Sequence, residues 1–243
     1  FRLSTPEVYK NWYQKDHVFI EGFQNAVYGQ PELFAEQIKK SSLVANPGCY
    51  PTASILSLAP LFAAGLIEEG SVIIDAKSGL TGAGVKANDT THFSNVNENF
   101  KAYSIGIHRH TVEIEEQFSI LGKSKVQVQF TPHLLPLDRG ILATSYAKTT
   151  RKLDQESLIS IYSDFYKGKP FVRIRKSAPD IKDVRGSHYC DIFPFWDERT
   201  GRIIAISAID NLLKGAASQA VHNMNLMLGL EEKTGLEQIP LRP

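Results

Sequence analysis

The spacing of apolar positions in residues 1–40 is typical of helices. Thr5 stands where a helix N-cap is expected, and Val8 and Trp12 give the helix that follows one apolar face. Residues 17–29 are aromatic and interrupted by glycine, so we expect a loop there. A second helix is predicted to begin at Pro31, because proline is favoured at the first helical position.

Residues 42–84 alternate between apolar runs and turn-forming residues. Residues 42–45 suit a short buried strand, and residues 53–59 mix large and small apolar side chains as a core-facing helix does. We expect Pro60 to break or kink this helix, because a proline inside a helix removes a backbone hydrogen bond. Residues 71–77 are rich in β-branched side chains and predict a strand, which leads into a glycine-rich loop at 78–84.

Strand patterns dominate the second half of the chain. Thr111 is the expected N-cap of an amphipathic helix that precedes them. Residues 125–130 alternate cleanly, and together with 141–147 they predict an antiparallel pair. Asp154 is expected to cap a helix that ends near residue 167. Further strands are predicted at 171–175, 189–196 and 203–209, followed by a helix that begins at residues 210–211.

Composition describes an ordinary globular protein of one large or two smaller domains. Hydrophobic residues make up 42% of the 243 positions, charged residues make up 22%, and the net charge is +1. That charge gives no global field to attract nucleic acid or an anionic membrane, so locally placed basic groups must hold any anionic substrate. We find no apolar run of about 18–20 residues and no metal-ligand spacing. Two cysteines fit a reducing cytoplasm better than secretion.

Cys49 is the candidate nucleophile. It lies in the motif NPGCYPT at residues 46–52, between the predicted strand and the predicted helix. A thiol at a helix N-terminus faces unpaired N–H groups, which favour the thiolate, so we expect a pKa below the usual value of about 8.5. The alternative is a buried, inert cysteine, which is how we interpret Cys190 in its apolar run.

His108, Arg109 and His110 stand together at the entry of the predicted helix around Thr111. The positive end of a helix disfavours the imidazolium, so a histidine here tends to stay neutral and able to accept a proton. Either histidine could instead be structural. The loop at 78–84 could likewise turn N–H groups toward an anion or admit a cofactor closely, or it could be only a surface connection.

These motifs together resemble the N-acetyl-gamma-glutamyl-phosphate reductase family, which shares its plan with the aspartate-semialdehyde and glyceraldehyde-3-phosphate dehydrogenases. The resemblance runs from end to end. It is carried in order by FRL at 1–3, NPGCYPT at 46–52, SGLTGAG at 78–84, HRHT at 108–111, FTPHL at 130–134, DRG at 138–140, VRGS at 184–187 and DNLLKGAA at 210–217. The chain departs from the family pattern at Val85 with Lys86, at Val112, and at His188, where the family has asparagine.

The resemblance implies an α/β protein. Residues 1–45 would be the remainder of a Rossmann-type NADP-binding domain, and 46–209 a glyceraldehyde-3-phosphate-dehydrogenase-like catalytic and oligomerisation domain with a mixed, largely antiparallel sheet. Residues 210–243 would supply a helix and tail that pack back on the cofactor domain. Family members begin with a glycine-rich dinucleotide fingerprint, which this sequence lacks before Cys49. We therefore expect a missing amino-terminal segment and weak NADPH binding by these residues alone.

The resemblance also implies a reaction. The Cys49 thiolate would attack N-acetyl-glutamyl phosphate, and the resulting thioester would be reduced with NADPH to the semialdehyde. His110 is the favoured acid/base, with His108 second. The substrate's anionic groups are assigned to Arg109, Arg139 and Arg185, and NADP contacts to Ser78, Gly79, Gly82, Gly84 and Asn211.

Three alternatives stay open at this stage. One is a cysteine hydrolase or acyltransferase that uses Cys49 and His110 without a cofactor. Another is a related reductase, such as aspartate-semialdehyde dehydrogenase, that acts on aspartyl phosphate. The last is a structural or assembly module whose catalytic groups are idle. In each case we expect a small-molecule substrate or none, no nucleic acid, no membrane and a homo-oligomer.

Overall fold

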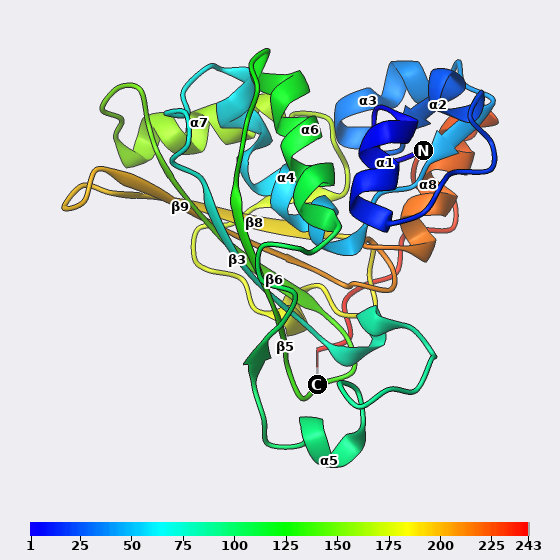
Figure 1. Cartoon of the computed structure of the whole chain (residues 1–243). Helices are drawn as coiled ribbons and strands as arrows, with labels where there is room; N and C mark the ends of the chain where they lie inside the picture. The colour runs from blue at the N-terminus through cyan, green and yellow to red at the C-terminus, as the bar shows by residue number, and fades with distance from the viewer. Residues whose placement is uncertain (243) are drawn as a thin grey trace.

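The computed structural model describes residues 1–242, in which a large mixed sheet lies beside a smaller amino-terminal unit (Figure 1). The helices are α1 (Pro6–Tyr13), α2 (Gly22–Asn25), α3 (Pro31–Ile38), α4 (Cys49–Ala63), α5 (Phe93–Val96), α6 (His110–Gly122), α7 (Gln155–Phe165) and α8 (Ala217–Met227). The strands are β1 (Ala26–Tyr28), β2 (Leu43–Ala45), β3 (Ile73–Ser78), β4 (Lys101–Ala102), β5 (Gln129–Leu134), β6 (Ile141–Lys148), β7 (Val172–Ile174), β8 (Cys190–Asp197) and β9 (Arg202–Ile209). Two 3₁₀ turns are η1 (Leu80–Ala83) and η2 (Ile181–Asp183).

The seven-stranded sheet has the order β4-β5-β3-β6-β9-β8-β7. Four of its pairings are antiparallel, and β3 with β5 and β7 with β8 are parallel, so the expected mixed, largely antiparallel sheet is confirmed. The predicted pairing of β5 with β6 is wrong, because β3 lies between them. Alternation along a strand reports one buried face but not which strand lies beside it.

Helix α4 packs on one face of this sheet and forms the centre of the core. Its side chains from Tyr50 to Phe62 are all buried. Of the break or kink expected at Pro60, the break is wrong, since the helix continues to Ala63. Proline lacks the N–H that would bond the carbonyl of Leu56, and the hydroxyl of Tyr166 donates to that carbonyl instead, at 2.5 Å. A tertiary contact thus compensates for the lost helical bond.

The amino-terminal unit combines α1, α2 and α3 with the parallel pair β1–β2, and α8 packs beside α3 (Figure 1). The expected Thr5 cap is confirmed, because its side chain accepts from the N–H of Val8. The loop expected at 17–29 instead contains α2 and β1. Strand β1 is three residues long and becomes a strand only by pairing with β2, which local sequence does not report.

The last helix starts later than the sequence predicts. Residues 211–216 form consecutive turns, and α8 begins at Ala217. The carboxylate of Asp210 accepts from the backbone N–H groups of Leu212 and Leu213, which fixes the tight turn. This 210–216 turn returns toward the start of α4 and is part of the site described next.

Candidate active site

Cys49 is the first residue of α4 and follows Gly48, which acts as the N-cap without a side chain. Residue Cys49 is half-buried. The backbone N–H groups of Cys49 and Tyr50 lower the pKa of the thiol, but burial acts more strongly and raises it to about 11. The expected low pKa is therefore wrong for this state of the protein. Helix position predicts only the stabilising contribution of the N–H groups, whereas burial depends on the tertiary fold, in which Gly215 packs against the Cys49 side chain.

Gly48 allows His110 to approach the start of α4. A Cβ atom added at Gly48 would lie 2.5 Å from Nε2 of His110, so no larger residue fits without moving the ring. The His110 side chain is buried, and its Nδ1 has no hydrogen-bond partner within residues 1–242. Burial, followed by the positive charges of neighbouring groups, holds the pKa of His110 well below its usual range. A neutral His110 matches the expectation, although burial and not the helix end is the main cause.

His108 differs from His110 in its surroundings. Its Nδ1 accepts from the backbone N–H of His110 at 3.2 Å, so His108 rather than Thr111 supplies the side-chain acceptor at the start of α6. The predicted Thr111 cap is wrong, and the Thr111 hydroxyl is buried without a partner in the described chain. Burial lowers the pKa of His108 to about 4, with Arg109 adding to the effect.

The two histidines line different, adjoining clefts, although their ring centres are only 4.8 Å apart. A cleft of about 280 Å³ contains Cys49 and His110, and a second of about 410 Å³ contains His108. Arg109 lines both clefts, and its guanidinium lies over the ring of Tyr13 at 5.5 Å. The first cleft is lined by Arg2, Asn46, Pro47, Gly48, Cys49, Thr81, Gly82, Gly84, Arg109, His110, Asn211, Leu212, Gly215 and Ala216. We call it the Cys49 cleft.

The glycine loop and Asn211 form one wall of the Cys49 cleft. The Asn211 side chain accepts from the N–H of Gly140 at 2.6 Å and donates to Oγ1 of Thr81 at 3.0 Å, which ties the 210–216 turn to the loop. One amide hydrogen and one lone pair of Asn211 remain for a ligand. Ser78 and Gly79, by contrast, lie behind this wall: Ser78 is buried, and a Cβ at Gly79 would meet the backbone of Asp138 at 2.6 Å.

Two of the three predicted anion-binding arginines lie outside the Cys49 cleft. Nε of Arg139 lies 3.4 Å from a carboxylate oxygen of the buried Asp210, so its charge is committed to that carboxylate. Arg185 is exposed on the segment after η2, and its carbonyl accepts from the N–H of Leu241. Of the predicted set only Arg109 lines the cleft.

Sequence reasoning missed Arg2 and Glu113. Arg2 lines the cleft, with Nε donating to the carbonyl of Asn46 at 2.6 Å. Glu113 is fully buried one turn after His110, and its Oε1 accepts from the N–H of Gly48 and the hydroxyl of Tyr28, both at 2.8 Å. The sequence contains only weak indications of these two residues. Arg2 belongs to FRL at 1–3, a match of three residues to the family pattern, and a glutamate in the first turn of a helix is common.

Residues 1–242 contain no cluster of three or more histidine, cysteine or carboxylate side chains arranged to hold a metal ion. Within the same residues, no helix combines the length and apolar character needed to cross a membrane.

Comparison with known proteins identifies the relatives of this chain. Residues 49–211 match the family described as semialdehyde dehydrogenase, dimerisation domain. The N-acetyl-gamma-glutamyl-phosphate reductase of Desulforudis audaxviator is 52% identical over 97% of this chain and 69% of its own length. The enzymes of the same name from Symbiobacterium thermophilum and Methanococcus maripaludis are 53% and 49% identical. The chain belongs to the N-acetyl-gamma-glutamyl-phosphate reductase family. The predicted family is confirmed.

The family and its structural neighbours define the fold and the class of chemistry. The chain spans about 70% of the length of its relatives. The crystal structure of aspartate semialdehyde dehydrogenase II from Vibrio cholerae matches with a TM-score of 0.66 and 16% identity, over 85% of this chain and 69% of that chain. The predicted α/β class, with a glyceraldehyde-3-phosphate-dehydrogenase-like domain, is confirmed. As a semialdehyde dehydrogenase family it uses a nicotinamide dinucleotide, and the dimerisation domain indicates an oligomer.

Proposed function

We propose that this chain reduces N-acetyl-L-glutamyl 5-phosphate to N-acetyl-L-glutamate 5-semialdehyde with NADPH, a step of arginine biosynthesis, through a thioester on Cys49. Relatives near 50% identity carry the name of this reductase, whereas the aspartate semialdehyde dehydrogenases resemble the chain at 16% identity and share its fold. The observation that carries the mechanism is that Cys49 and a neutral His110 line the same cleft.

The residues of the Cys49 cleft fit the nicotinamide end of a dinucleotide. Gly82 and Gly84 leave the loop wall without side chains, and Asn211 retains hydrogen-bonding capacity beside them. When bound there, the reduced nicotinamide supplies a hydride. These three residues would hold that ring, and Ser78 and Gly79 would support the wall from behind. The same wall supports the reductase over a cysteine hydrolase, which would have no use for it.

The protein's own groups perform the acyl transfer. His110 accepts the thiol proton, and the Cys49 sulfur forms a bond to the acyl carbon as the carbon–oxygen bond to phosphate breaks. The proton on His110 passes to the departing phosphate. After hydride transfer the carbon–sulfur bond breaks, which releases the semialdehyde and the thiolate. Arg109 and Arg2, which line the cleft, are the nearest cations for the substrate's anionic groups.

The proposed mechanism must account for the free energy needed to ionise the Cys49 thiol, because burial disfavours the thiolate. With its pKa raised to about 11, Cys49 is almost wholly protonated at neutral pH. The thiol therefore needs a base. Burial keeps His110 neutral, and so free to accept a proton, at physiological pH, while the same lowered pKa makes it a weaker base than an ordinary histidine. His110 meets this requirement better than His108, which lines the neighbouring cleft.

The assay that tests the proposed function follows NADPH oxidation and aldehyde formation together. We expect NADPH oxidation and aldehyde formation to proceed at equal rates. We also expect N-acetyl-glutamyl phosphate to compete effectively against aspartyl phosphate. NADH is the matched control for the cofactor. Release of N-acetyl-glutamate without NADPH oxidation would instead favour the hydrolase.

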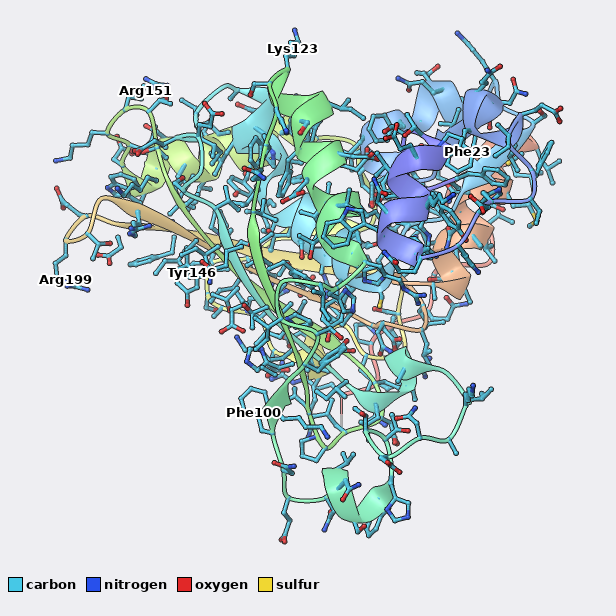
Figure 2. All side chains as sticks on the ribbon, viewed as in Figure 1. Phe23, Phe100, Lys123, Tyr146, Arg151 and Arg199 are labelled. Carbon is cyan, nitrogen blue, oxygen red and sulfur yellow. The ribbon has the colours of Figure 1, made fainter. Side chains whose placement is uncertain are left out.

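We also propose a homo-oligomer that forms through the sheet face away from α4. Apolar side chains on this face lie in register across four strands: Phe195 pairs with Ile204, Ile204 with Tyr146, and Tyr146 with Ile73. Figure 2 labels Tyr146 in this row, and Phe195 and Ile73 are exposed. Such a row is suited to burial against a second copy.

The proposed domains follow the same contacts. Residues 1–45 and 210–243 would form the cofactor side and 46–209 the catalytic domain, supported by the packing of α3 on α8 and by the bond from Asn223 to the carbonyl of Gly29. Both cysteines are free, which fits a reducing compartment, and we place the reaction in the cytoplasm.

A further inference from the structure

The 210–216 turn touches the nucleophile through its backbone. A Cβ added at Gly215 would lie 2.8 Å from Cβ of Cys49 and 2.6 Å from the carbonyl oxygen of Asn211. The next residue is tied to the nucleophile's motif, because the side chain of Asn46 donates to the carbonyl of Ala216 at 3.1 Å. The backbone of this turn therefore packs directly against the side chain of Cys49 and is tied to its motif.

Lys214 immediately precedes the two residues that make these contacts and has an unusual environment. Its side chain is completely buried, and Nζ lies 2.5 Å from Oε1 of Glu32, which is also buried. Nζ is 3.3 Å from Nε2 of His188 and 6.0 Å from the ring centre of Phe171. Glu32 is held in turn by the side-chain amide of Gln30 at 2.8 Å. The ion pair lowers the pKa of Glu32 to about 2.

This ion pair joins segments that are far apart in sequence. Glu32 belongs to α3 of the amino-terminal unit, whereas Lys214 belongs to the turn that lines the Cys49 cleft. A buried ion pair contributes little net stability, because desolvation offsets the attraction, so the main consequence of this pair is the geometry that it imposes.

We propose that Lys214 is a positioning residue, which through its pairing with Glu32 holds the 210–216 turn against Cys49 and so sets the exposure of the thiol. The relevance of this role to catalysis rests on the proposed function, whereas the exposure of the thiol can be measured without it. Glu113 and Arg2, the other charges that act on the thiol, lie on α6 and at the amino end and do not contact Lys214 in any recorded hydrogen bond or ion pair of the described chain.

The test is the pH profile of Cys49 alkylation by iodoacetamide, followed by mass spectrometry of the Cys49 peptide, in the 243-residue chain. The double variant Lys214→Met/Glu32→Leu keeps the volume and removes both charges. We expect a thermal midpoint near that of the wild type, at least about fivefold faster alkylation at pH 8, and a lower pH midpoint, because a released turn uncovers the thiol. The matched control is Lys152→Met, which removes an exposed ion pair with Glu198 and should change none of these.

A second variant covers the case in which the double variant does not fold. Glu32→Gln keeps the shape and removes the charge, and we expect the same direction of change at smaller size. A folded variant of either kind with the wild-type alkylation rate and midpoint would overturn the proposal. Because alkylation requires neither substrate nor cofactor, this outcome is separate from failure of the reductase assay.

Discussion

Substituting Gly48 by alanine perturbs the contact between the nucleophile's turn and His110. The backbone at Gly48 has φ −71° and ψ 156°, which alanine adopts freely, so the substitution causes no backbone strain. Its effect must come from the added methyl group. That group would lie 2.5 Å from Nε2 of His110 and 2.9 Å from two ring carbons.

The size of the effect follows from these distances. To restore an ordinary contact of 3.4 Å, the ring and Gly48 must separate by about 0.9 Å. Overpacking of this kind costs about 1–3 kcal/mol of stability. A displacement of about 1 Å between reacting groups costs about a hundredfold in rate. We therefore expect Gly48→Ala to fold with a lowered thermal midpoint and to lose about two orders of magnitude in kcat.

The assay is steady-state reduction of N-acetyl-glutamyl phosphate, together with thermal unfolding of the same preparations. Gly122→Ala is the matched control, because it adds the same methyl group at the end of α6, where the nearest atom is a side-chain carbon of Phe62 at 3.2 Å. It should keep kcat within about twofold. A Gly48→Ala variant with wild-type kcat would refute the assignment of His110 as the base that rests on this glycine.

The remaining predictions concern stability, pH and assembly. The pKa of His108 is lowered to about 4 and that of His110 is lowered well below its usual range, so both lie below the unfolded value of about 6.5, and the free energy of unfolding should be greatest above pH 6.5. It should then fall with acidification by up to about 1.4 kcal/mol per pH unit for each histidine. Urea titrations at pH 7.5 and 5 measure this, and a flat profile would contradict it. Glu113→Ala should cost about 1–3 kcal/mol for each donor left unpaired, whereas Glu113→Gln should retain most stability in thermal unfolding, and equal losses would contradict the assigned bonds. Tyr146→Asp should shift the oligomer toward monomer in analytical ultracentrifugation, and an unchanged sedimentation coefficient would exclude this face.

Local chemistry made much of the fold predictable from sequence. The Thr5 and Asp154 caps and the apolar patterns of β9 and of the run around Cys190 are visible within a few residues, and the structure confirms the caps, the strand and the burial of Cys190. The pairing of β3 between β5 and β6 was not predictable, because strand alternation carries no information about neighbours.

In the candidate site, too, the features set by local sequence were predictable and those set by tertiary contacts were not. The motif placed Cys49 at a helix start, but burial by the tertiary fold, in which Gly215 packs against the Cys49 side chain from 166 residues later, reverses the expected pKa shift. Glu113 also escaped notice, since its role is defined by the N–H of Gly48 and the hydroxyl of Tyr28, which only the tertiary fold brings to it. Long-range burial, rather than residue identity, decides the electrostatics here.

The measurement that tests the central claim most directly is the turnover of Cys49→Ser in the NADPH-coupled reductase assay, with Cys190→Ser as the control for loss of a thiol. The hydroxyl occupies nearly the same space but is a far weaker nucleophile. We expect Cys49→Ser to keep less than about a hundredth of wild-type kcat, which corresponds to a loss of at least ~2.7 kcal/mol of transition-state stabilisation. Retention of more than that fraction would show that Cys49 is not the nucleophile.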